Sequence, residues 1–347
     1  MDLSNNNSLI IYLSFVLIYS FYFIYKFDFF LKKIKIYDKK NKDKLISCSG
    51  GIFIYVYVFI SFCYFFLNIE HFSFVRNFFH NFSDQINFSL KEMLVFILMP
   101  SIFFAVGLFD DKYSLSANIR IFIFFIISII LISFDKDNFL TELNFSFVEK
   151  TFELNDIFSV IFTSLCIISF LVALNMYDGI NLQTAGYLIF LCIVFLLNNI
   201  LEVFIIGLLI VLITFSYLNF KNKCFLGDSG TYFCATMFAL ILIKSSNKNI
   251  FYADQVIFLL IIPMFDMIRV IILRLIRGKH PFKGDKTHLH HIIGRKINKL
   301  IVFIIILSLN IVAYLSYLFL YQKIFSLLIT LSLYLITLFY FRKKNEI

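Results

Sequence analysis

Charged residues are scarce in this chain, and their scarcity excludes an ordinary water-soluble domain. Asp, Glu, Lys and Arg make up 15% of the 347 residues and hydrophobic residues make up 61%, whereas soluble domains are about 25% charged. Proline and glycine are also few, 3 and 11 residues. No Pro/Gly linker, internal repeat or low-complexity segment divides the chain. We therefore expect residues 1–347 to form a single integral-membrane domain.

The cysteines lack the spacing of a zinc site or a disulfide framework, because no two of them form a C-x-x-C pair. The six are Cys48, Cys63, Cys166, Cys192, Cys224 and Cys234. Four of them lie inside apolar segments. We expect them to be small packing residues.

Apolar segments close to the ~20 residues that cross a bilayer recur along the chain. We predict eleven spans, at 8–25, 49–68, 92–109, 118–134, 155–173, 184–198, 203–219, 231–244, 254–273, 299–319 and 323–341. The first is expected to be a true span rather than a signal peptide, because MDLSNNN carries no positive charge and no small-residue cleavage site follows. The predicted fold is an all-α polytopic membrane protein.

Lysine and arginine set the predicted orientation, because cytoplasmic loops carry an excess of both. They concentrate after the first span, between Lys32 and Lys44, and after the ninth, between Arg274 and Lys296. This places the N-terminus outside and the C-terminus in the cytoplasm. The net charge of +9 is therefore mainly a topology signal. The basic loops also favour anionic lipid headgroups or phosphorylated ligands, and they imply no nucleic acid.

Four polar clusters stand at the ends of predicted spans. They are Asp110 and Asp111 in GLFDDK, Asn175 and Asp178 in NMYDG, Asp228 in FLGDSG, and His288, His290 and His291 in HPFKGDKTHLHH. Ionisable groups at membrane depth are costly and often functional, although single ones also serve as interfacial caps. All four clusters fall on the cytoplasmic side of the predicted topology, which favours an active site on that face.

Oxygen ligands dominate the first three clusters, and Mg²⁺ accepts such ligands while it keeps waters and binds substrate phosphates. Asp110 and Asp111 repel each other and need a nearby cation, either Lys112 or a metal. Asn175 and Asp178 share a face if the helix continues through them. FLGDSG is either a turn between spans or a place where an anion approaches the first amides of the next helix.

The histidine segment is rich in hydrogen-bond donors that can reach phosphate or uracil oxygens. Its cationic neighbours are Arg274, Arg277, Lys279, Lys283 and Lys286. A zinc site of three histidines is the weaker alternative, because these cations would repel the metal.

Two other segments predict local structure only. LNFSFVEK, Leu143 to Lys150, alternates apolar and polar residues, which is typical of a short strand or hairpin edge. Asp266 and Arg269 in PMFDMIRV are three residues apart on the ninth span. We expect them to pair with each other rather than with a ligand.

The four motifs, in this order, resemble those of the polyprenyl-phosphate N-acetylhexosamine-1-phosphate transferases, the superfamily that includes phospho-N-acetylmuramoyl-pentapeptide transferase. The resemblance extends from Ser49-Gly50-Gly51 to the last span. The form His288-Leu289-His290-His291 is more similar to the N-acetylglucosamine-1-phosphate branch, because in the peptidoglycan branch three histidines run together.

The resemblance implies a reaction that depends on Mg²⁺, with Mn²⁺ as an alternative. A sugar-1-phosphate, N-acetylglucosamine-1-phosphate or another N-acetylhexosamine-1-phosphate, passes from a UDP-sugar to polyprenyl (undecaprenyl) phosphate, and UMP is released. This is the first membrane step of cell-surface polysaccharide synthesis, in the cytoplasmic (inner) membrane. By this matching, Asp110 and Asp111 are catalytic beside the lipid phosphate, and Asn175 and Asp228 hold the metal. The implied substrate contacts are Asp178, Asn181, Arg277, His288, His290 and His291.

One motif departs from the family pattern D-G-x-D/N-G-L. This chain reads Asp178-Gly179-Ile180-Asn181-Leu182-Gln183 and lacks the second glycine. We expect Asn181 to tune the sugar or nucleotide contact rather than to perform chemistry.

A multi-span transporter of an anionic substrate is the alternative function, and a catalytically silent scaffold is a third. A transporter would place ionisable residues near the midplane on broken helices and would show repeat symmetry, and the sequence indicates neither. The sequence leaves open which sugar and polyprenol react, and whether the protein forms a homodimer. It also leaves open whether the lipid phosphate attacks directly or through a covalent Asp intermediate.

Overall fold

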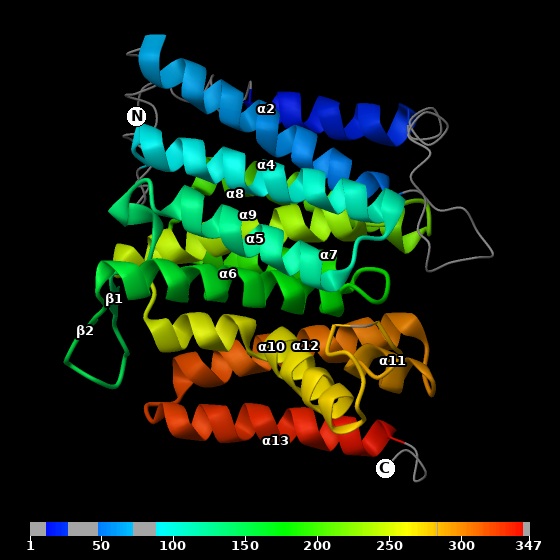
Figure 1. Ribbon diagram of the computed structural model, residues 1–347. Helices are drawn as coiled ribbons and strands as arrows, with labels where there is room; N and C mark the ends of the chain where they lie inside the picture. The colour runs from blue at the N-terminus through cyan, green and yellow to red at the C-terminus, as the bar shows by residue number, and fades with distance from the viewer. Residues whose placement is uncertain (1–11, 27–47, 72–87, 283, 343–347) are drawn as a thin grey trace. The chain divides into compact units, whose positions relative to one another are not determined.

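The computed structural model describes residues 12–26, 48–71, 88–282 and 284–342, and most of these residues are helical (Figure 1). A first helix covers Tyr12–Lys26. The others are α2 (Ser49–His71), α4 (Leu90–Tyr113), α5 (Ala117–Ile132), α6 (Asp156–Tyr177), α7 (Gln183–Leu197), α8 (Glu202–Phe220), α9 (Gly227–Asn247), α10 (Ala253–Ile276), α11 (Leu289–Gly294), α12 (Lys299–Phe319) and α13 (Lys323–Phe341).

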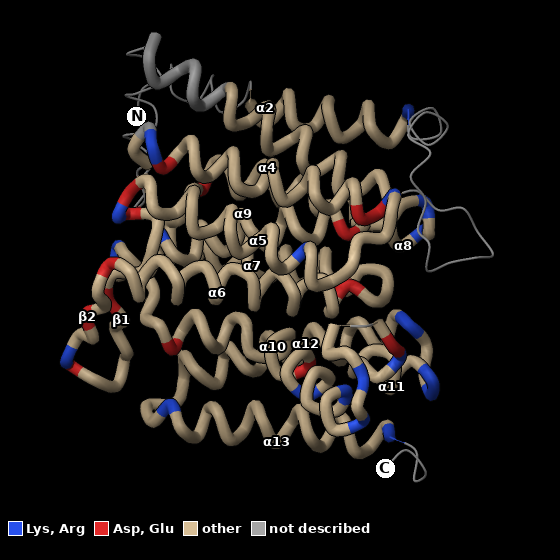
Figure 2. Tube along the Cα trace, in the orientation of Figure 1, with Lys and Arg blue, Asp and Glu red and all other residues tan. Residues whose placement is uncertain are grey.

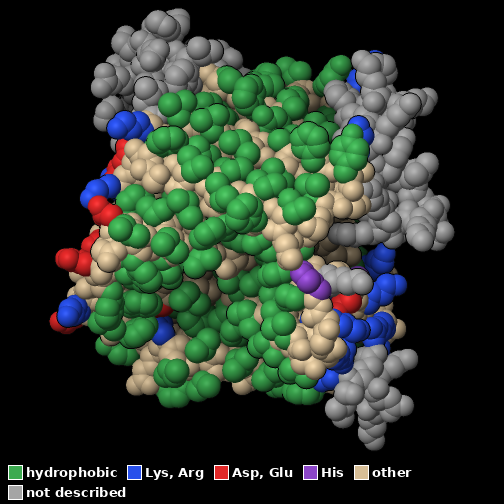
Figure 3. Space-filling model, viewed as in Figure 1, with side chains coloured by type: hydrophobic (Ala, Val, Ile, Leu, Met, Phe, Trp, Pro, Cys, Tyr) green, Lys and Arg blue, Asp and Glu red, His purple; other side chains and the backbone are tan. Residues whose placement is uncertain are grey.

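Within the described residues, each predicted span overlaps one of these helices, and the short α11 was not predicted as a span. Residues 8–11 of the first predicted span lie outside the described residues. Six helices are long and apolar enough to cross a membrane, namely α4, α6, α8, α10, α12 and α13. Hydrophobic side chains cover most of the helical surface visible in Figure 3, as lipid-facing helices require. The protein is therefore an all-α polytopic membrane protein. The lysines at 32–44, on which the predicted orientation depends, lie outside the described residues.

Short polar side chains start several of the helices. Ser89 and Glu92 form a reciprocal capping box at α4, with Ser89 N donating to Glu92 Oε2 at 2.6 Å. Asn155 accepts from Phe158 N at 2.8 Å before α6, and Asn298 accepts from Leu300 N at 3.0 Å before α12. These caps satisfy first-turn amides that have no partner within the helix, so the polar residues between apolar runs set where each helix begins.

The helices group into two compact units, and each unit is built from two separate parts of the chain. Unit 1 contains residues 1–114 and 188–237, and unit 2 contains residues 115–187 and 238–347. In unit 1, α2 packs against α4 and α8. Aromatic side chains dominate this packing, since the Tyr55 ring stacks on Phe104 at 4.2 Å and meets the edge of Phe233 at 5.3 Å.

In unit 2, α10 packs against α6 and α12, α5 packs against α6, and α12 packs against α13. The short α11 packs on α12 and α13. Buried polar groups also join these helices, because Asn310 Nδ2 donates to the Tyr177 hydroxyl at 3.0 Å and the Tyr187 hydroxyl donates to Leu259 O at 3.0 Å. In unit 2, the histidine segment is therefore supported by the packed helices α12 and α13.

A small antiparallel hairpin precedes α6, formed by β1 (Glu142–Leu143) and β2 (Phe152–Glu153). Of the two alternatives for 143–150, the hairpin is confirmed and a strand over the whole segment is wrong, because only Leu143 lies in a strand and the rest connects the two strands. The connection is held instead by contacts to α10: Ser146 N donates to Asp254 Oδ1 at 2.9 Å, and Ala253 N donates to Asn144 O at 2.7 Å.

Glycine allows a close approach between α4 and the start of α9 within unit 1. A Cβ on Gly107 would overlap the backbone of Ser229, and a Cβ on Gly51 would lie 2.6 Å from Gly230 Cα. Because the obstructing atoms are backbone, they cannot move aside cheaply. These glycines therefore determine how closely α2 and α4 pack on the turn that begins α9.

We predict that Gly107→Ala destabilises the protein by about 1–3 kcal/mol, because it overpacks this contact. Alanine within a helix normally stabilises it by about 0.5–1 kcal/mol relative to glycine. The loss of stability expected for Gly107→Ala is therefore the opposite of what helix propensity alone predicts. The measurement is the apparent melting temperature in detergent.

Gly294→Ala on α11 is the matched control, since a Cβ there meets only Val302 Cγ2, at 3.9 Å. A Gly107→Ala protein that melts at or above the wild-type temperature would contradict the close packing described here.

Candidate active site

Asp111 links the end of α4 to the start of α9. Its carboxylate accepts hydrogen bonds from Asp228 N at 2.9 Å, from Ser229 N at 3.1 Å and from Ser229 Oγ at 2.8 Å. An anion before the first amides of α9 was one of the two alternatives for FLGDSG, and in the structure the side chain of Asp111 occupies this place. Negative charge is favourable there because of the exposed amides and the helix dipole. Two motifs far apart in the sequence, GLFDDK and FLGDSG, therefore meet in unit 1.

The segment Cys48 to Gly51 also holds the FLGDSG turn. Gly50 N and Gly51 N, at the start of α2, donate to Phe225 O at 3.0 Å and Leu226 O at 3.1 Å. Gly227 has a φ of +75°, which glycine adopts without strain. The turn that carries Asp228 is thus fixed by two helix ends, those of α2 and α4.

Asp110 lies next to Asp111 but in a different environment. It is 5% exposed and accepts a hydrogen bond from the Tyr232 hydroxyl at 3.3 Å. Tyr232 is one helical turn after Asp228 on α9, so the two motifs share a second contact. The ammonium group of Lys112, the counter-ion suggested by the sequence, lies 5.0 Å from the centre of the Tyr113 ring.

The carboxylates of Asp110 and Asp228 are hard oxygen ligands at the end of a membrane helix, which fits a divalent cation such as Mg²⁺. Within the described part of the chain, no three His, Cys, Asp or Glu side chains converge as a complete metal site. This ligand set fits Mg²⁺, which retains waters and takes phosphate oxygens, better than it fits zinc. Asn175 belongs to unit 2 and Asp228 to unit 1, so their pairing on one metal stays a prediction.

In unit 2, α6 ends at Tyr177, one residue before Asp178. Asp178 is the C-cap residue of α6: its N–H still donates to Leu174 O, and the chain turns there, with φ and ψ of −75° and 67°. The helix therefore does not continue past Asp178, and the end of the helix lies where Gly179 allowed one. The Asp178 side chain accepts a hydrogen bond from Thr184 Oγ1 at 2.7 Å, in the first turn of α7. The half-buried Asn181 lies in the turn between the two helices.

His290 lies against Gly179. A Cβ on Gly179 would overlap the imidazole ring of His290, so this position requires glycine. The ring of His290 is 2% exposed and its centre lies 4.2 Å from that of His291. The NMYDG motif and the histidine segment, which are far apart in the sequence, therefore meet in unit 2.

Asp266 on α10 contacts the histidine segment directly. The expected ion pair with Arg269 is confirmed, with 2.7 Å between Arg269 Nη2 and Asp266 Oδ1. The sequence did not predict two further contacts, His288 Nδ1 to Asp266 Oδ2 at 2.9 Å and Leu289 N to Asp266 Oδ1 at 3.1 Å.

Arg274 and Asp285 fix the loop before α11. Arg274 donates to both carboxylate oxygens of Asp285, at 3.1 and 3.0 Å, and to Pro281 O at 2.6 Å. Arg274 is 2% exposed, so it is a structural residue rather than the substrate donor suggested by its place among the loop cations. Burial raises the pKa of Asp285, but hydrogen bonds from Arg274 and Thr287 outweigh burial and hold that pKa below its usual range.

The remaining predicted contacts lie at the surface of this loop. Arg277 caps the C-terminus of α10 and is exposed, and Lys and Arg gather around α11 and the loop before it (Figure 2). Burial, reinforced by nearby cations such as Lys286, lowers the pKa of His291 to about 4. His291 is therefore neutral at pH 7 and can both donate and accept hydrogen bonds. Lys283 lies outside the described residues.

Together, the fold and these two clusters define a polytopic helical membrane protein that presents carboxylates in one unit and histidines with cations in the other. Such groups are suited to phosphorylated ligands. The model of glycosyl transferase family 4 matches residues 93–246. This range contains the motifs GLFDDK, NMYDG and FLGDSG, and it stops before the histidine segment.

Curated relatives extend the similarity. The chain is 24% identical over 281 residues to the undecaprenyl-phosphate alpha-N-acetylglucosaminyl 1-phosphate transferase of Escherichia coli K12, covering 76% of this chain and 70% of that protein. It is 26% identical over 283 residues to the Yersinia pestis protein of the same name, with the same coverage. It is 27% identical over 200 residues to a probable undecaprenyl-phosphate N-acetylglucosaminyl 1-phosphate transferase of Bacillus subtilis, covering 55% of each chain. These matches support the resemblance of the motifs to those of the polyprenyl-phosphate N-acetylhexosamine-1-phosphate transferase superfamily.

We predict that Asp111→Ala lowers the stability of the protein by about 0.5–2 kcal/mol, the usual effect of removing a helix N-cap acceptor. Asp111→Asn keeps an acceptor oxygen and should lose less. The measurement is the apparent melting temperature of the purified variants in detergent.

Asp156→Ala is the matched control, because Asp156 forms an exposed pair with Lys136 at 2.6 Å, with side chains 60% and 71% exposed. Exposed pairs contribute little to stability. Equal melting temperatures for Asp111→Ala and Asp156→Ala would contradict the capping role of Asp111.

Proposed function

We propose that this protein transfers N-acetylglucosamine 1-phosphate from UDP-N-acetylglucosamine to undecaprenyl phosphate and releases UMP. The family match and the names of the relatives support this reaction. The structural observation that carries the proposal is the contact between Asp111 and the first turn of α9, because it brings the paired acidic residues at the end of α4 to the turn that carries Asp228. A phosphoryl-transfer site needs such a cluster to hold cations and phosphate in line. No observation specifically favours the transporter alternative.

In unit 1 we assign Asp228 and Asp110 to the chemistry. Asp228 would hold Mg²⁺, or Mn²⁺, which neutralises charge on the pyrophosphate when bound. The buried Asp110, oriented by Tyr232, would face the lipid phosphate and hold or accept its proton. Asp111 binds the first amides of α9 and so fixes the end of α4 to the start of α9. Its contribution is to position Asp110 and Asp228 relative to each other. Asn175 remains the second metal ligand that we propose from the family motif.

In unit 2 we assign the nucleotide-sugar to the histidine segment and the NMYDG turn. His290 and the neutral His291 can donate to phosphate or uracil oxygens, and the exposed Arg277 can pair with a phosphate. Asp178 can accept from the ribose or the base, and Asn181 tunes this contact. In the reaction, an oxygen of the lipid phosphate forms a bond to the sugar-bearing phosphorus, the bond to UMP breaks, and UMP leaves with the electron pair.

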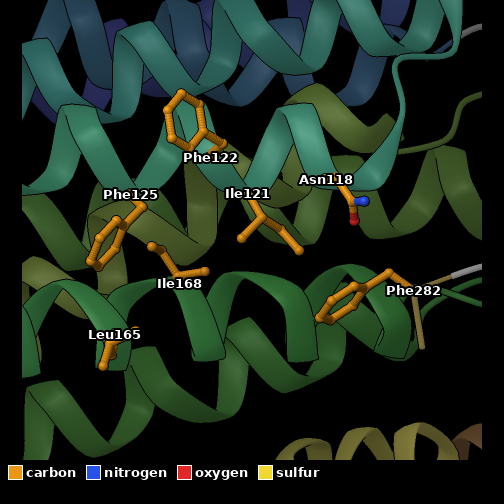
Figure 4. A pocket seen from close by; sticks show the side chains of 7 residues that line it. All are labelled: Asn118, Ile121, Phe122, Phe125, Leu165, Ile168 and Phe282. Carbon is orange, nitrogen blue, oxygen red and sulfur yellow. The ribbon is translucent and has the colours of Figure 1, made fainter. Parts of the chain in front are cut away.

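We further assign the polyprenyl chain to an apolar cavity of about 350 Å³ between α5 and α6. Figure 4 shows Phe282 and Asn118 at one end of this cavity and Phe125 and Leu165 at the other. His280, two residues before Phe282, contacts Asn118 at 3.1 Å, so the cavity begins beside the histidine segment. An isoprenoid tail would bury its surface against these side chains.

The proposal includes a topology for the reaction. We place eleven spans in the cytoplasmic membrane, with the N-terminus outside and the C-terminus in the cytoplasm. The UDP-sugar arrives from the cytosol and the lipid phosphate sits at the membrane interface, so the reaction belongs on the cytoplasmic face. It would be the first membrane step of a cell-surface polysaccharide.

We predict that purified protein releases UMP from UDP-N-acetylglucosamine only when undecaprenyl phosphate and Mg²⁺ are both present. EDTA and Asp228→Ala should each lower the rate at least 100-fold, because either change removes charge stabilisation from the transition state. The measurement follows UMP and the lipid-linked sugar together. Asp156→Ala removes an exposed carboxylate that belongs to none of the four motifs, and it should keep the wild-type rate.

The proposed reaction would be refuted if no UDP-N-acetylhexosamine gave UMP or a lipid-linked sugar in folded protein with its normal melting temperature. A rate that is unchanged by Asp228→Ala would refute the assignment of the metal.

We predict that Ile121→Trp raises the KM for undecaprenyl phosphate about 10-fold, because the ring fills the cavity, and hydrophobic-pocket discrimination is of this order. The KM for the UDP-sugar should stay the same. Ile126→Trp is the control on the same helix, since Ile126 is 39% exposed and does not line the cavity. Equal KM values for both variants would show that the lipid chain binds elsewhere.

A further inference from the structure

Asp266 joins three helices at the beginning of the histidine segment. It is 5% exposed. Besides His288 and Leu289, it accepts from the Tyr334 hydroxyl of α13 at 2.9 Å, and Arg269 Nε donates to the same hydroxyl at 2.8 Å. A carboxylate buried this deeply needs several donors to remain charged. Its contacts therefore form one connected network from α10 to α11 and α13.

The network determines where His288 carries its proton. A guanidinium group can only donate, and Arg274 Nη2 lies 3.4 Å from His288 Nε2. Nε2 must therefore accept, which leaves the proton on Nδ1, where it is donated to Asp266 Oδ2 at 2.9 Å. His288 is 6% exposed. Both of its ring nitrogens are engaged by protein, so neither is directed to a ligand.

Asp266 also holds the first amide of α11. His288 is the N-cap residue of this helix and makes no side-chain cap bond of its own, whereas Leu289 N donates to Asp266 at 3.1 Å. One carboxylate thus fixes both the side chain of the N-cap residue and the backbone that follows it. The His290 ring comes next, parallel to that of His288 at 5.5 Å and in contact with Gly179.

We propose that Asp266 is a positioning residue of the transferase site. It locks His288 in the Nδ1–H form, and through His288 and α11 it places His290 against Gly179 of the NMYDG turn. His288, the first histidine of the segment, then has a structural role, and His290 and His291 make the nucleotide contacts. This inference rests on the proposed function for its kinetic test but not for its spectroscopic test. It also changes the role of His288, which the family resemblance assigned to substrate.

The direct test is the tautomer of His288 in protein labelled with ¹⁵N-histidine and purified in detergent. We expect one histidine with a protonated Nδ1 and a bare Nε2, and its signals should disappear in His288→Asn. This measurement uses wild-type protein without substrate, so it decides the inference even if the proposed reaction fails. A His288 protonated on Nε2 would overturn it.

The kinetic test compares two replacements of His288. Asn places its amide nitrogen near the position of Nδ1 and can donate to Asp266, whereas Gln places its nitrogen near the position of Nε2. We expect His288→Asn to retain at least 10-fold more kcat/KM for the UDP-sugar than His288→Gln. A substrate contact through Nε2 would reverse this order and overturn the proposal.

Two further variants separate positioning from simple stabilisation. Asp266→Asn should lower kcat/KM at least 10-fold when His288 is present, but less than 2-fold in a His288→Ala background, because Asp266 acts through His288. Arg269→Gln removes the ion pair but keeps the contact between Asp266 and His288, so it should lower the melting temperature without this loss of rate. Independent effects of Asp266 and His288, or an equal loss of rate in Arg269→Gln, would overturn the positioning role.

Discussion

The contact between the Asp111 carboxylate and the first amides of α9 solves a problem that every polar group in this protein faces. A charge near hydrocarbon is costly unless donors surround it, and the first amides of a helix are unpaired donors. The same solution recurs in unit 2, where Asp266 accepts from the first amide of α11. Asp178 finds its donor in a side chain instead, the Thr184 hydroxyl in the first turn of α7. Asp111 and Asp266 therefore hold the beginnings of α9 and α11, the helices that carry Asp228 and His290.

This arrangement explains how four motifs that are far apart in the chain meet in pairs. Within unit 1 the end of α4 meets the start of α9, and within unit 2 the end of α6 meets α11. Glycine makes both meetings close, since side chains at Gly107 and Gly179 would overlap Ser229 and His290. A transfer reaction needs its groups held within fractions of an ångström, and backbone-to-side-chain contacts of this kind are stiffer than contacts between two flexible side chains.

Much of this could be predicted from the sequence, for physical reasons. Runs of about 20 apolar residues require helices in a bilayer, and polar caps such as Ser89 and Asn155 stand where those helices start. Asp266 and Arg269 pair because three residues on a helix bring side chains together. Local patterns were least informative where the backbone turns. The sequence left open whether the helix continues through Asp178, and α6 ends at Tyr177. LNFSFVEK is mostly a connection because contacts to Asp254 and Ala253 hold it.

The sequence by itself determined the class of the protein, its helices, its four motifs and the family that these motifs resemble, because these depend on composition and on local order. Only the tertiary structure decided what each polar residue does. It showed that Asp111 caps α9, that the buried Arg274 holds Asp285 and that Asp266 is the partner of His288. Each of these roles depends on a donor or acceptor more than ten residues away in the chain. Hydrogen-bond partners at such separations leave no periodic trace in the sequence, and only the folded chain brings them within 3 Å of one another.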